Sequence, residues 1–289
     1  MFKSLKFSKP KTPGYGISKD FYLTVLCCGS PLPILSDVIH PTGADQAIEG
    51  FGVPLDPRLG KECLNYPMER GAYAFATKDR KTVLRSIVVS VDDAHFQPQA
   101  IVQQDELRES AEELKERIRC AKNLVQLCFE IHDPMVAPAM QFLLQIAAKL
   151  GTLSKGCIAD PLSCRYALPE EVLHAAQIKS MYAPVHVSVH HRLAGGFVSC
   201  QTRGLAKFAL PEIAVAQVSE VVAGAAEQLL MNVVQRQLDG SLVAVGDRIG
   251  TKAAQFRVHA CSSGTWELIP EVGTTDEALS AWVASSSPN

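Results

Sequence analysis

The chain has 289 residues, of which 47% are hydrophobic and 20% are charged, an ordinary composition for a globular protein with a sizeable core. Its formal net charge of −2 shows no basic surplus of the kind that nucleic-acid-binding proteins carry, and no apolar run reaches the roughly 18 residues of a membrane helix. We therefore predict that neither nucleic acid nor a membrane is a partner.

The N-terminal part pairs a basic tail with one strand and a long irregular segment. Residues 1–20 are predicted to be frayed, and their pattern does not fit a signal peptide. The apolar run from Phe21 to Cys28 predicts a buried strand. Residues 29–71 are rich in proline and glycine and predict a covering loop, a functional flap, or short helices near 45–48 and 59–64; the role of this segment stays open.

Strand and helix patterns then alternate. Strands are predicted at 72–76, 82–91, 124–131 and 156–160, with helices at 105–121, 133–150 and 169–177; the tail adds strands at 213–217, 242–245, 255–261 and 266–272 and a helix at 219–238. Alternation at this spacing favours right-handed crossovers between parallel strands. The fold class that we predict is α+β: one mixed sheet, with a parallel β-α-β-α-β core and an antiparallel hairpin, covered by helices. We expect one domain over 21–280, with a division near residue 180 left open and residues 281–289 frayed.

The hairpin is the clearest local pattern of the chain. Valines alternate with polar residues from Val185 to Val189, and Phe197 to Arg203 would form the return strand. A two-residue loop at Ala194 and Gly195 predicts these cross-strand pairs: Val189 with Cys200, Val187 with Thr202, His190 with Ser199, Ser188 with Gln201 and His186 with Arg203.

One face of this hairpin is polar and offers a candidate ligand site. It consists of His186, His190, Gln201 and Arg203. Histidines four residues apart on a strand lie roughly 13 Å apart, too far to bind one metal ion together. The alternative, which the pattern favours, is that these residues form the solvent-exposed face of a sheet whose other face is buried.

A short motif follows the hairpin. Thr202, Gly204, Leu205, Phe208, Glu212 and Ile213 fit the pattern T-x-G-L-x-x-F-G-x-x-E-[LI], with Ala209 where glycine is usual. The chain from about Val83 onward thereby resembles a bacterial family of uncharacterised proteins, a domain-of-unknown-function group whose activity is not established. The resemblance implies a bacterial origin and no particular activity. For Gly204 we expect a turn or bulge, and for Phe208 a core anchor.

Acidic residues follow the strands of the alternating region. Asp92, Asp133 with His132, and Asp160 would meet at one edge if these strands were parallel neighbours. Carboxylates gathered there could bind Mg²⁺ or Mn²⁺ or act as acid and base. The alternative is helix capping, above all by Asp133, which precedes a proline.

Nine cysteines, an odd number, mostly occupy apolar runs without a metal-binding spacing. We predict free thiols throughout and hence a cytoplasmic protein. The chain has no common nucleotide-binding, zinc-protease or serine-hydrolase motif. We therefore expect a soluble, non-catalytic binding or interaction protein with a protein or small-molecule partner, no cofactor and an unknown oligomeric state. The alternative is a metal-dependent hydrolase that uses the strand-end acids.

Overall fold

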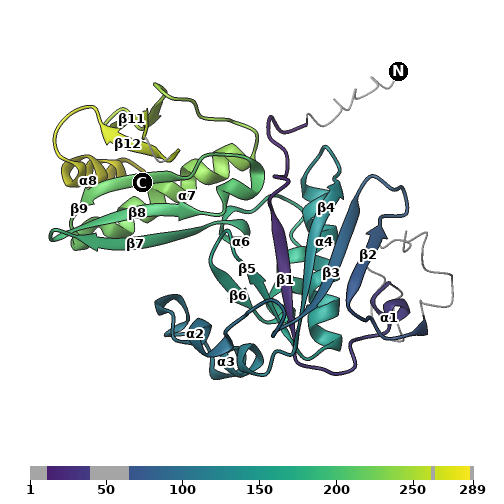
Figure 1. Ribbon diagram of the computed structural model, residues 1–289. Helices are drawn as coiled ribbons and strands as arrows, with labels where there is room; N and C mark the ends of the chain where they lie inside the picture. Colours follow the sequence, from purple (N-terminus) through teal and green to yellow (C-terminus); the bar gives the residue numbers. More distant parts are fainter. Residues whose placement is uncertain (1–11, 40–64, 262–263, 287–289) are drawn as a thin grey trace, which may run out of the picture.

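The computed structural model describes residues 12–39, 65–261 and 264–286, so that the segment 40–64, with both short helices predicted there, lies outside the described residues. Figure 1 shows two lobes side by side, each a twisted sheet with helices behind it. The first sheet has the order β2 (Gly71–Ala76), β3 (Val83–Ser90), β4 (Asn123–Ile131), β1 (Tyr22–Cys27), β5 (Cys157–Asp160), β6 (Arg165–Ala167). The second has the order β10 (Arg248–Gly250), β11 (Gln255–Ala260), β12 (Trp266–Pro270), β9 (Ile213–Val218), β8 (Phe197–Arg203), β7 (Ser188–Ala194).

The helices follow the chain in eight α-helical segments within the described ranges. They are α1 (Leu35–Ile39), α2 (Pro98–Val102), α3 (Glu112–Arg119), α4 (Ala137–Leu153), α5 (Pro169–Ala176), α6 (Ala183–His186), α7 (Ala223–Leu238) and α8 (Thr275–Ser286), with three 3-10 turns at η2 (Asp105–Leu107), η3 (Leu205–Phe208) and η4 (Glu220–Val222). Most predicted elements are present near their expected bounds. The helix expected at 105–121 is divided between η2 and α3, and Gly151 lies inside α4 rather than ending it.

The predicted parallel core is wrong, because every neighbouring pair in the first sheet is antiparallel. The chain leaves β3 at Ser90 and enters β4 at Asn123, and these two residues are paired. The segment with α2 and α3 therefore starts and ends at the same edge of the sheet and makes no crossover. An alternation of strands and helices does not by itself distinguish such an excursion from a crossover.

The connection through α4 is a crossover, but its two strands are not neighbours. β4 and β5 both pair antiparallel with β1, so they run in the same direction on either side of it. The N-terminal strand thus fills the gap that a βαβ unit would have closed. Because of this insertion, β4 and β5 are not the parallel neighbours that the sequence predicted, although both strands are present.

The two faces of the first sheet are covered differently. α4 packs against β1 and β5 and is itself covered by α5, within the main core. α3 lies on the opposite face, over a separate cluster of seven buried residues: Leu26, Leu107, Leu114, Ile118, Ala121, Leu124 and Cys157. The first sheet is therefore sandwiched only at the end where α3 lies.

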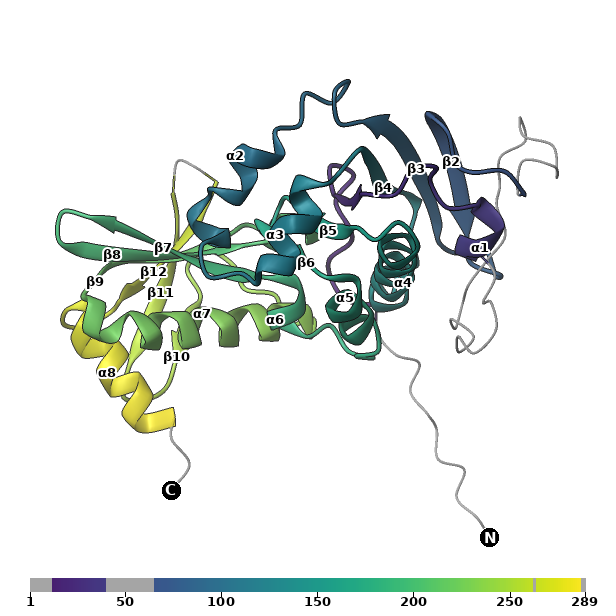
Figure 2. The same ribbon diagram turned by 90° about the horizontal axis from the view of Figure 1, so that it is seen from below.

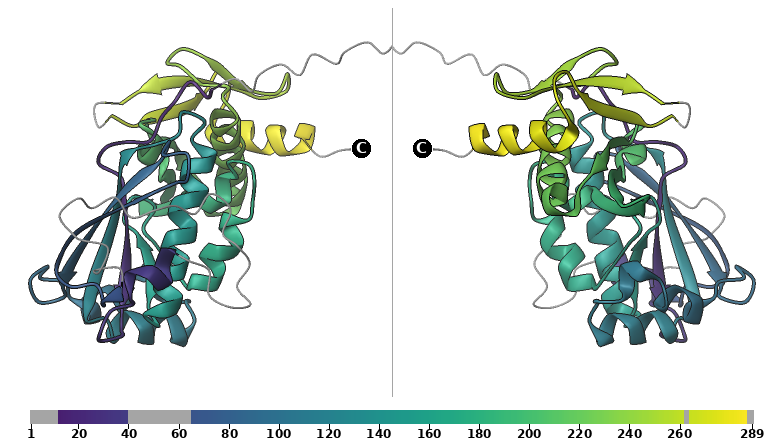
Figure 3. Two further views of the ribbon diagram at one scale, coloured as in Figure 1. Left: turned by 90° about the vertical axis from the view of Figure 1, so that its right-hand side faces the viewer. Right: turned by 90° about the vertical axis from the view of Figure 1, so that its left-hand side faces the viewer.

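The second sheet is mixed, because β9 and β12 are parallel and its other pairs are antiparallel. α7 packs on β7, β8 and β9, and α8 packs on α7 and β12. Figure 2 shows both helices on one side of this sheet, and Figure 3 shows α8 extending to the outside of the molecule. Residues 281–286 are thus helical, and Trp282 is buried, which contradicts the frayed end predicted there.

The hairpin forms with a register two residues away from the predicted one. Its loop is Gly195-Gly196, both with positive φ (61° and 82°), so Ala194 pairs with Phe197. A tight hairpin turn favours positive φ at both loop positions, and glycine adopts it without strain, which is why the turn centres on the two glycines. A shift of two keeps every side chain on its predicted face.

The stretch before the hairpin is not a strand. Val185 and His186 belong to α6, and His186 is buried rather than on the polar face. The strand predicted at 242–245 is also absent from the structure, and β10 lies further along at Arg248–Gly250. A proline at the first helical turn of α6 explains the first difference.

The N-terminal segment is not a loose tail where it is described. Tyr15 and Ile17 are buried, and the Tyr15 hydroxyl donates to the carbonyl of Leu238 in α7 at 2.6 Å. The main buried cluster contains residues of both sheets and of this segment. The lobes therefore share one apolar core, and residue 180 lies in the link between them.

Candidate functional site

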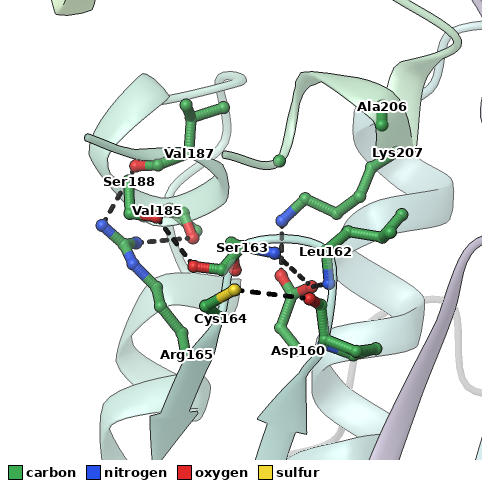
Figure 4. Close-up of polar contacts among 12 residues, drawn as sticks. Asp160, Leu162, Ser163, Cys164, Arg165, Val185, Val187, Ser188, Ala206 and Lys207 are labelled. Carbon is green, nitrogen blue, oxygen red and sulfur yellow. Dashed lines mark hydrogen bonds and ion pairs between the residues drawn. The ribbon is translucent and has the colours of Figure 1, made fainter. Parts of the chain in front are cut away.

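The junction between the lobes holds a group of buried and half-buried polar side chains, and Figure 4 shows Asp160, Ser163, Arg165 and Lys207 among them. We call Asp160, Ser163, Arg165, His186 and Lys207 the interlobe network. Asp160 ends β5, and one carboxylate oxygen accepts the backbone N–H groups of Leu162 and Ser163, both at 3.2 Å. This turn between β5 and β6 fixes the carboxylate toward the second lobe.

Lys207 reaches that carboxylate from η3 in the second lobe. Its Nζ lies 2.5 Å from Asp160 Oδ2, with side-chain exposures of 1% and 13%. The ammonium also lies 5.6 Å from the centre of the Phe21 ring. Burial lowers the pKa of Lys207, and the attraction of Asp160 opposes this shift. The two side chains form a buried ion pair that connects the lobes.

Arg165 connects the first sheet to the backbone of α6 and the start of β7. Its guanidinium donates to the carbonyls of Pro184, Val185 and Val187, the last at 3.0 Å. Burial lowers the pKa of Arg165, while Asp160 acts against that shift. The Ser188 hydroxyl adds a hydrogen bond to the carbonyl of Ser163 at 2.7 Å. These hydrogen bonds of Arg165 and Ser188 go to backbone carbonyls of the protein itself, so they hold the link between the lobes.

His186 occupies the centre of the junction as a neutral ring. Burial, followed by the charges of Lys207 and Arg165, lowers its pKa well below the usual value. The ring stands edge-on to Phe208 at 5.7 Å. A cavity of about 10 Å³ beside it is lined by residues of α4, α5 and α6 and by the segment after α5. That volume suits about one water molecule and no organic substrate.

The motif residues lock the same junction from the second lobe. The Thr202 hydroxyl donates to Glu212 at 2.7 Å, and the other Glu212 oxygen accepts the N–H groups of Gly204 and Ala206. Gly204 has φ of 118°, and a Cβ there would lie 2.4 Å from the carbonyl oxygen of His186. Phe208 is fully buried. The turn at Gly204 and the core role of Phe208 are confirmed, and the motif is structural.

The predicted ligand residues are only partly brought together. His190 and Gln201 are direct cross-strand partners on the solvent side of the second sheet. Arg203 pairs with Ser188 at the base of the hairpin, and His186 is buried in the junction. Of the four predicted residues, only His190 and Gln201 are therefore direct neighbours. Arg203 lies two residues after Gln201 in β8, on the same face.

That pair belongs to a longer row that crosses five strands. Successive partners are His190, Gln201, Ala214, Glu267 and His259, all on the face opposite α7, and we call them the cross-strand row. The register also places Arg192, Phe197 and Ile269 on this open face. Phe197 is 51% exposed and Ile269 is 39% exposed. Sequence reasoning missed Glu267 and His259, because register across distant strands is set only in the folded sheet.

The strand-end acids lie at separate places. Asp92 follows β3 and is exposed at one edge of the first sheet, whereas Asp133 follows β4 at the opposite edge. Asp160 shares the edge of Asp133 but lies across β1 and is paired with Lys207. Among the described residues, no group of three or more His, Cys, Asp or Glu side chains could hold a metal ion.

His132 and Asp133 have local structural roles. The Nε2 atom of His132 accepts the backbone N–H of Ile17 at 3.3 Å, which ties the N-terminal segment to the end of β4. Asp133 accepts the N–H of Met135 at 2.8 Å, so it caps the turn that leads into α4. The N-cap residue of α4 is Val136, and no side chain caps the helix, so the N-cap role predicted for Asp133 is wrong and its role is confined to the turn before the helix.

The prediction of free thiols throughout is wrong for one pair. Cys28 and Cys120 form a disulfide, with Cα atoms 5.2 Å apart. The other six described cysteines form no disulfide: Cys27, Cys128, Cys157, Cys164, Cys200 and Cys261. The two partners are 92 residues apart, and sequence reasoning had no signal that would bring the end of β1 to the end of α3.

No family model, no curated protein and no solved structure matches this chain. The resemblance to an uncharacterised bacterial family accordingly stays a prediction. No helix in the described ranges is both long enough and apolar enough to cross a lipid bilayer.

Proposed function

We propose that the protein is a non-catalytic interaction protein whose partner binds on the open face of the second sheet. The observation that carries this proposal is the cross-strand row, in which two histidines, a glutamine and a glutamate lie on either side of Ala214 across five strands. The opposite face of the same sheet is covered by α7 and α8, whereas on this face His259, Phe197 and Ile269 are exposed.

The composition of the face favours a protein over a small molecule. Phe197 and Ile269 add exposed apolar surface beside the polar row, as in the anchors and rim of protein interfaces. Small-molecule sites are concave and usually occupy hundreds of cubic ångströms, whereas the cavity beside His186 has about 10 Å³.

The charges of the face favour an acidic partner. Arg192 and Arg203 lie on it, against Glu267 from the row. Such a bias speeds association with a surface of opposite charge and selects against basic ones. A protein with an acidic patch and an apolar residue to contact Phe197 is the partner class that we propose.

The alternative metal-dependent hydrolase has less support. It requires Asp92, Asp133 and Asp160 to converge, and the antiparallel first sheet separates them. Bacterial origin, cytoplasmic location and solubility stay predictions. If the protein is cytoplasmic, its acidic partner is a cytoplasmic protein as well.

Site-specific photo-cross-linking in cells tests the proposal. A benzophenone amino acid at position 197 should give a discrete adduct with one protein, and the same group at position 173 should not. Leu173 in α5 is a matched control, because it is 43% exposed, against 51% for Phe197, and lies on the other lobe.

Affinity for the purified adduct partner then gives the second readout. Phe197→Glu and Arg192→Glu should each weaken binding at least about tenfold, the loss of one interface anchor, while Leu173→Glu leaves it unchanged. Equal adducts at both positions, or an unchanged affinity of the Phe197 variant, would contradict the proposal.

A further inference from the structure

The Cys28–Cys120 disulfide connects the first sheet to the helix on its less covered face. Cys28 follows β1 directly, and Cys120 is the C-cap residue of α3. Both residues are half-buried, so the bond lies near the surface. It is the covalent connection between the strand end and the helix end.

α3 packs outside the main core of the protein. Its buried side chains are Leu114 and Ile118, and they pack in the small second cluster rather than in the main core. Arg117 donates to the carbonyl of Gly156 at 3.0 Å, and the N–H of Lys122 donates to that of Cys27 at 2.8 Å. A short helix held by so small a cluster belongs to the less stable parts of a fold.

Two neighbouring thiols cannot take part in thiol–disulfide exchange with this bond in the folded protein. Cys27 and Cys157 are fully buried beside it, and burial raises the pKa of each to about 12. Only a thiolate attacks a disulfide, so these thiols stay unreactive in the folded protein. Neither of these two described thiols is therefore a reactant for this bond, and we take the reactant to be an external thiol.

The reduced pair is accommodated without loss of hydrogen bonding. The sulfur atoms of Cys28 and Cys120 lie 3.1 Å and 3.5 Å from the carbonyl oxygen of Arg117. After reduction, each S–H can donate to this acceptor. The site therefore suits both redox states, while the free and partly exposed Cys128, Cys164 and Cys261 suit reducing surroundings, in which disulfides are usually reversible.

We propose that Cys28 and Cys120 form a reversible thiol–disulfide exchange site whose reactant is a dithiol. One thiolate of the dithiol attacks a sulfur of the pair, and the S–S bond breaks to give a mixed disulfide and a protein thiolate. The second thiol then closes the dithiol into its own disulfide, so the protein gains two electrons and two protons and the dithiol loses them. Oxidised, the pair holds α3 on the sheet; reduced, it lets the helix detach. This site is independent of the partner surface on the second sheet.

Differential alkylation of the folded and denatured protein tests the bond itself. Protein purified without reductant should give no alkylated Cys28 or Cys120 after denaturation, and dithiothreitol should expose both. Oxidised dithiothreitol should then restore the protected pair. Alkylation of Cys28 before any reduction would overturn the proposal, as would a pair that dithiothreitol leaves oxidised in the folded protein.

Hydrogen exchange tests the consequence for α3. Reduction should speed amide exchange in residues 112–121 at least tenfold and leave β8 unchanged. Cys28→Ser with Cys120→Ser should match the reduced wild type, and Cys27→Ser should still show the redox response. If the double variant fails to fold, the reduced wild type still decides, because equal exchange in its two redox states rejects the release of α3.

Discussion

At the scale of single residues, His186 makes stability depend on pH. Its folded pKa lies well below that of the unfolded chain, so below about pH 6.5 the unfolded state binds a proton that the folded state does not. Stability is therefore lost as the pH falls. Between pH 7 and pH 5.5 the loss due to this residue should be about 1 kcal/mol.

Urea unfolding of the wild type and of His186→Gln at these two pH values measures that contribution. The variant should lose less stability on acidification, by about the same 1 kcal/mol. All other residues are the same in both proteins, so the difference between the two losses isolates the contribution of His186. Equal losses in the two proteins would show that His186 is protonated in the folded state.

Lys207 and Asp160 should be strongly coupled, because both lie inside the junction. Asp160→Asn keeps an acceptor for the turn but leaves the lysine charge buried without its counter-ion. The expected cost is about 3–5 kcal/mol. Adding Lys207→Met should recover most of this loss. A double-mutant cycle checks this: the free energy of unfolding by denaturant is measured for the wild type, both single variants and the double variant. Additive losses would contradict the coupling.

At the scale of elements, the turn into η3 depends on a glycine. Gly204→Ala would place a Cβ against the His186 carbonyl and should cost more than about 4 kcal/mol, as large steric changes in a core do. Gly195→Ala is the matched control: its φ is also positive, but no atom lies within 4 Å of the added Cβ. It should cost about 1 kcal/mol. Similar thermal shifts for both variants would remove the steric explanation.

At the end of η3, replacement of an alanine by glycine should stabilise the protein. Ala209 has φ of 53°, a left-handed conformation at the position where the motif usually has glycine. Ala209→Gly should therefore stabilise the protein, by about 0.5–1 kcal/mol after the entropy of glycine is subtracted. Thermal unfolding measures the change. A destabilised variant would show that the packing of the Ala209 methyl group outweighs the relief of its left-handed backbone conformation.

At the scale of the whole molecule, the shared core predicts a single unfolding transition. The two tryptophans, Trp266 and Trp282, both lie in the second lobe and report its unfolding by fluorescence. The buried thiols of Cys27 and Cys157 report the first lobe by their reactivity. The two probes should give the same urea midpoint. Separate midpoints would show that the lobes are independent domains divided near residue 180.

The sequence by itself determined most of the elements, because their signals are local. The apolar run of β1, the double glycine of the hairpin and the proline at the start of α5 each act through neighbouring residues. The structural roles of Gly204 and Phe208 were also within reach, since a glycine between a strand and an apolar run indicates a turn.

Only the tertiary structure decided how these elements pair. The return of the chain from β3 to the neighbouring β4, and the insertion of β1 between β4 and β5, made the first sheet antiparallel and separated the strand-end acids. The packing of the two lobes paired Asp160 with Lys207. The same long-range pairing created the cross-strand row and brought Cys28 to Cys120. Strand neighbours and disulfide partners are chosen by the packing of the whole apolar core, and no window of local sequence contains that choice.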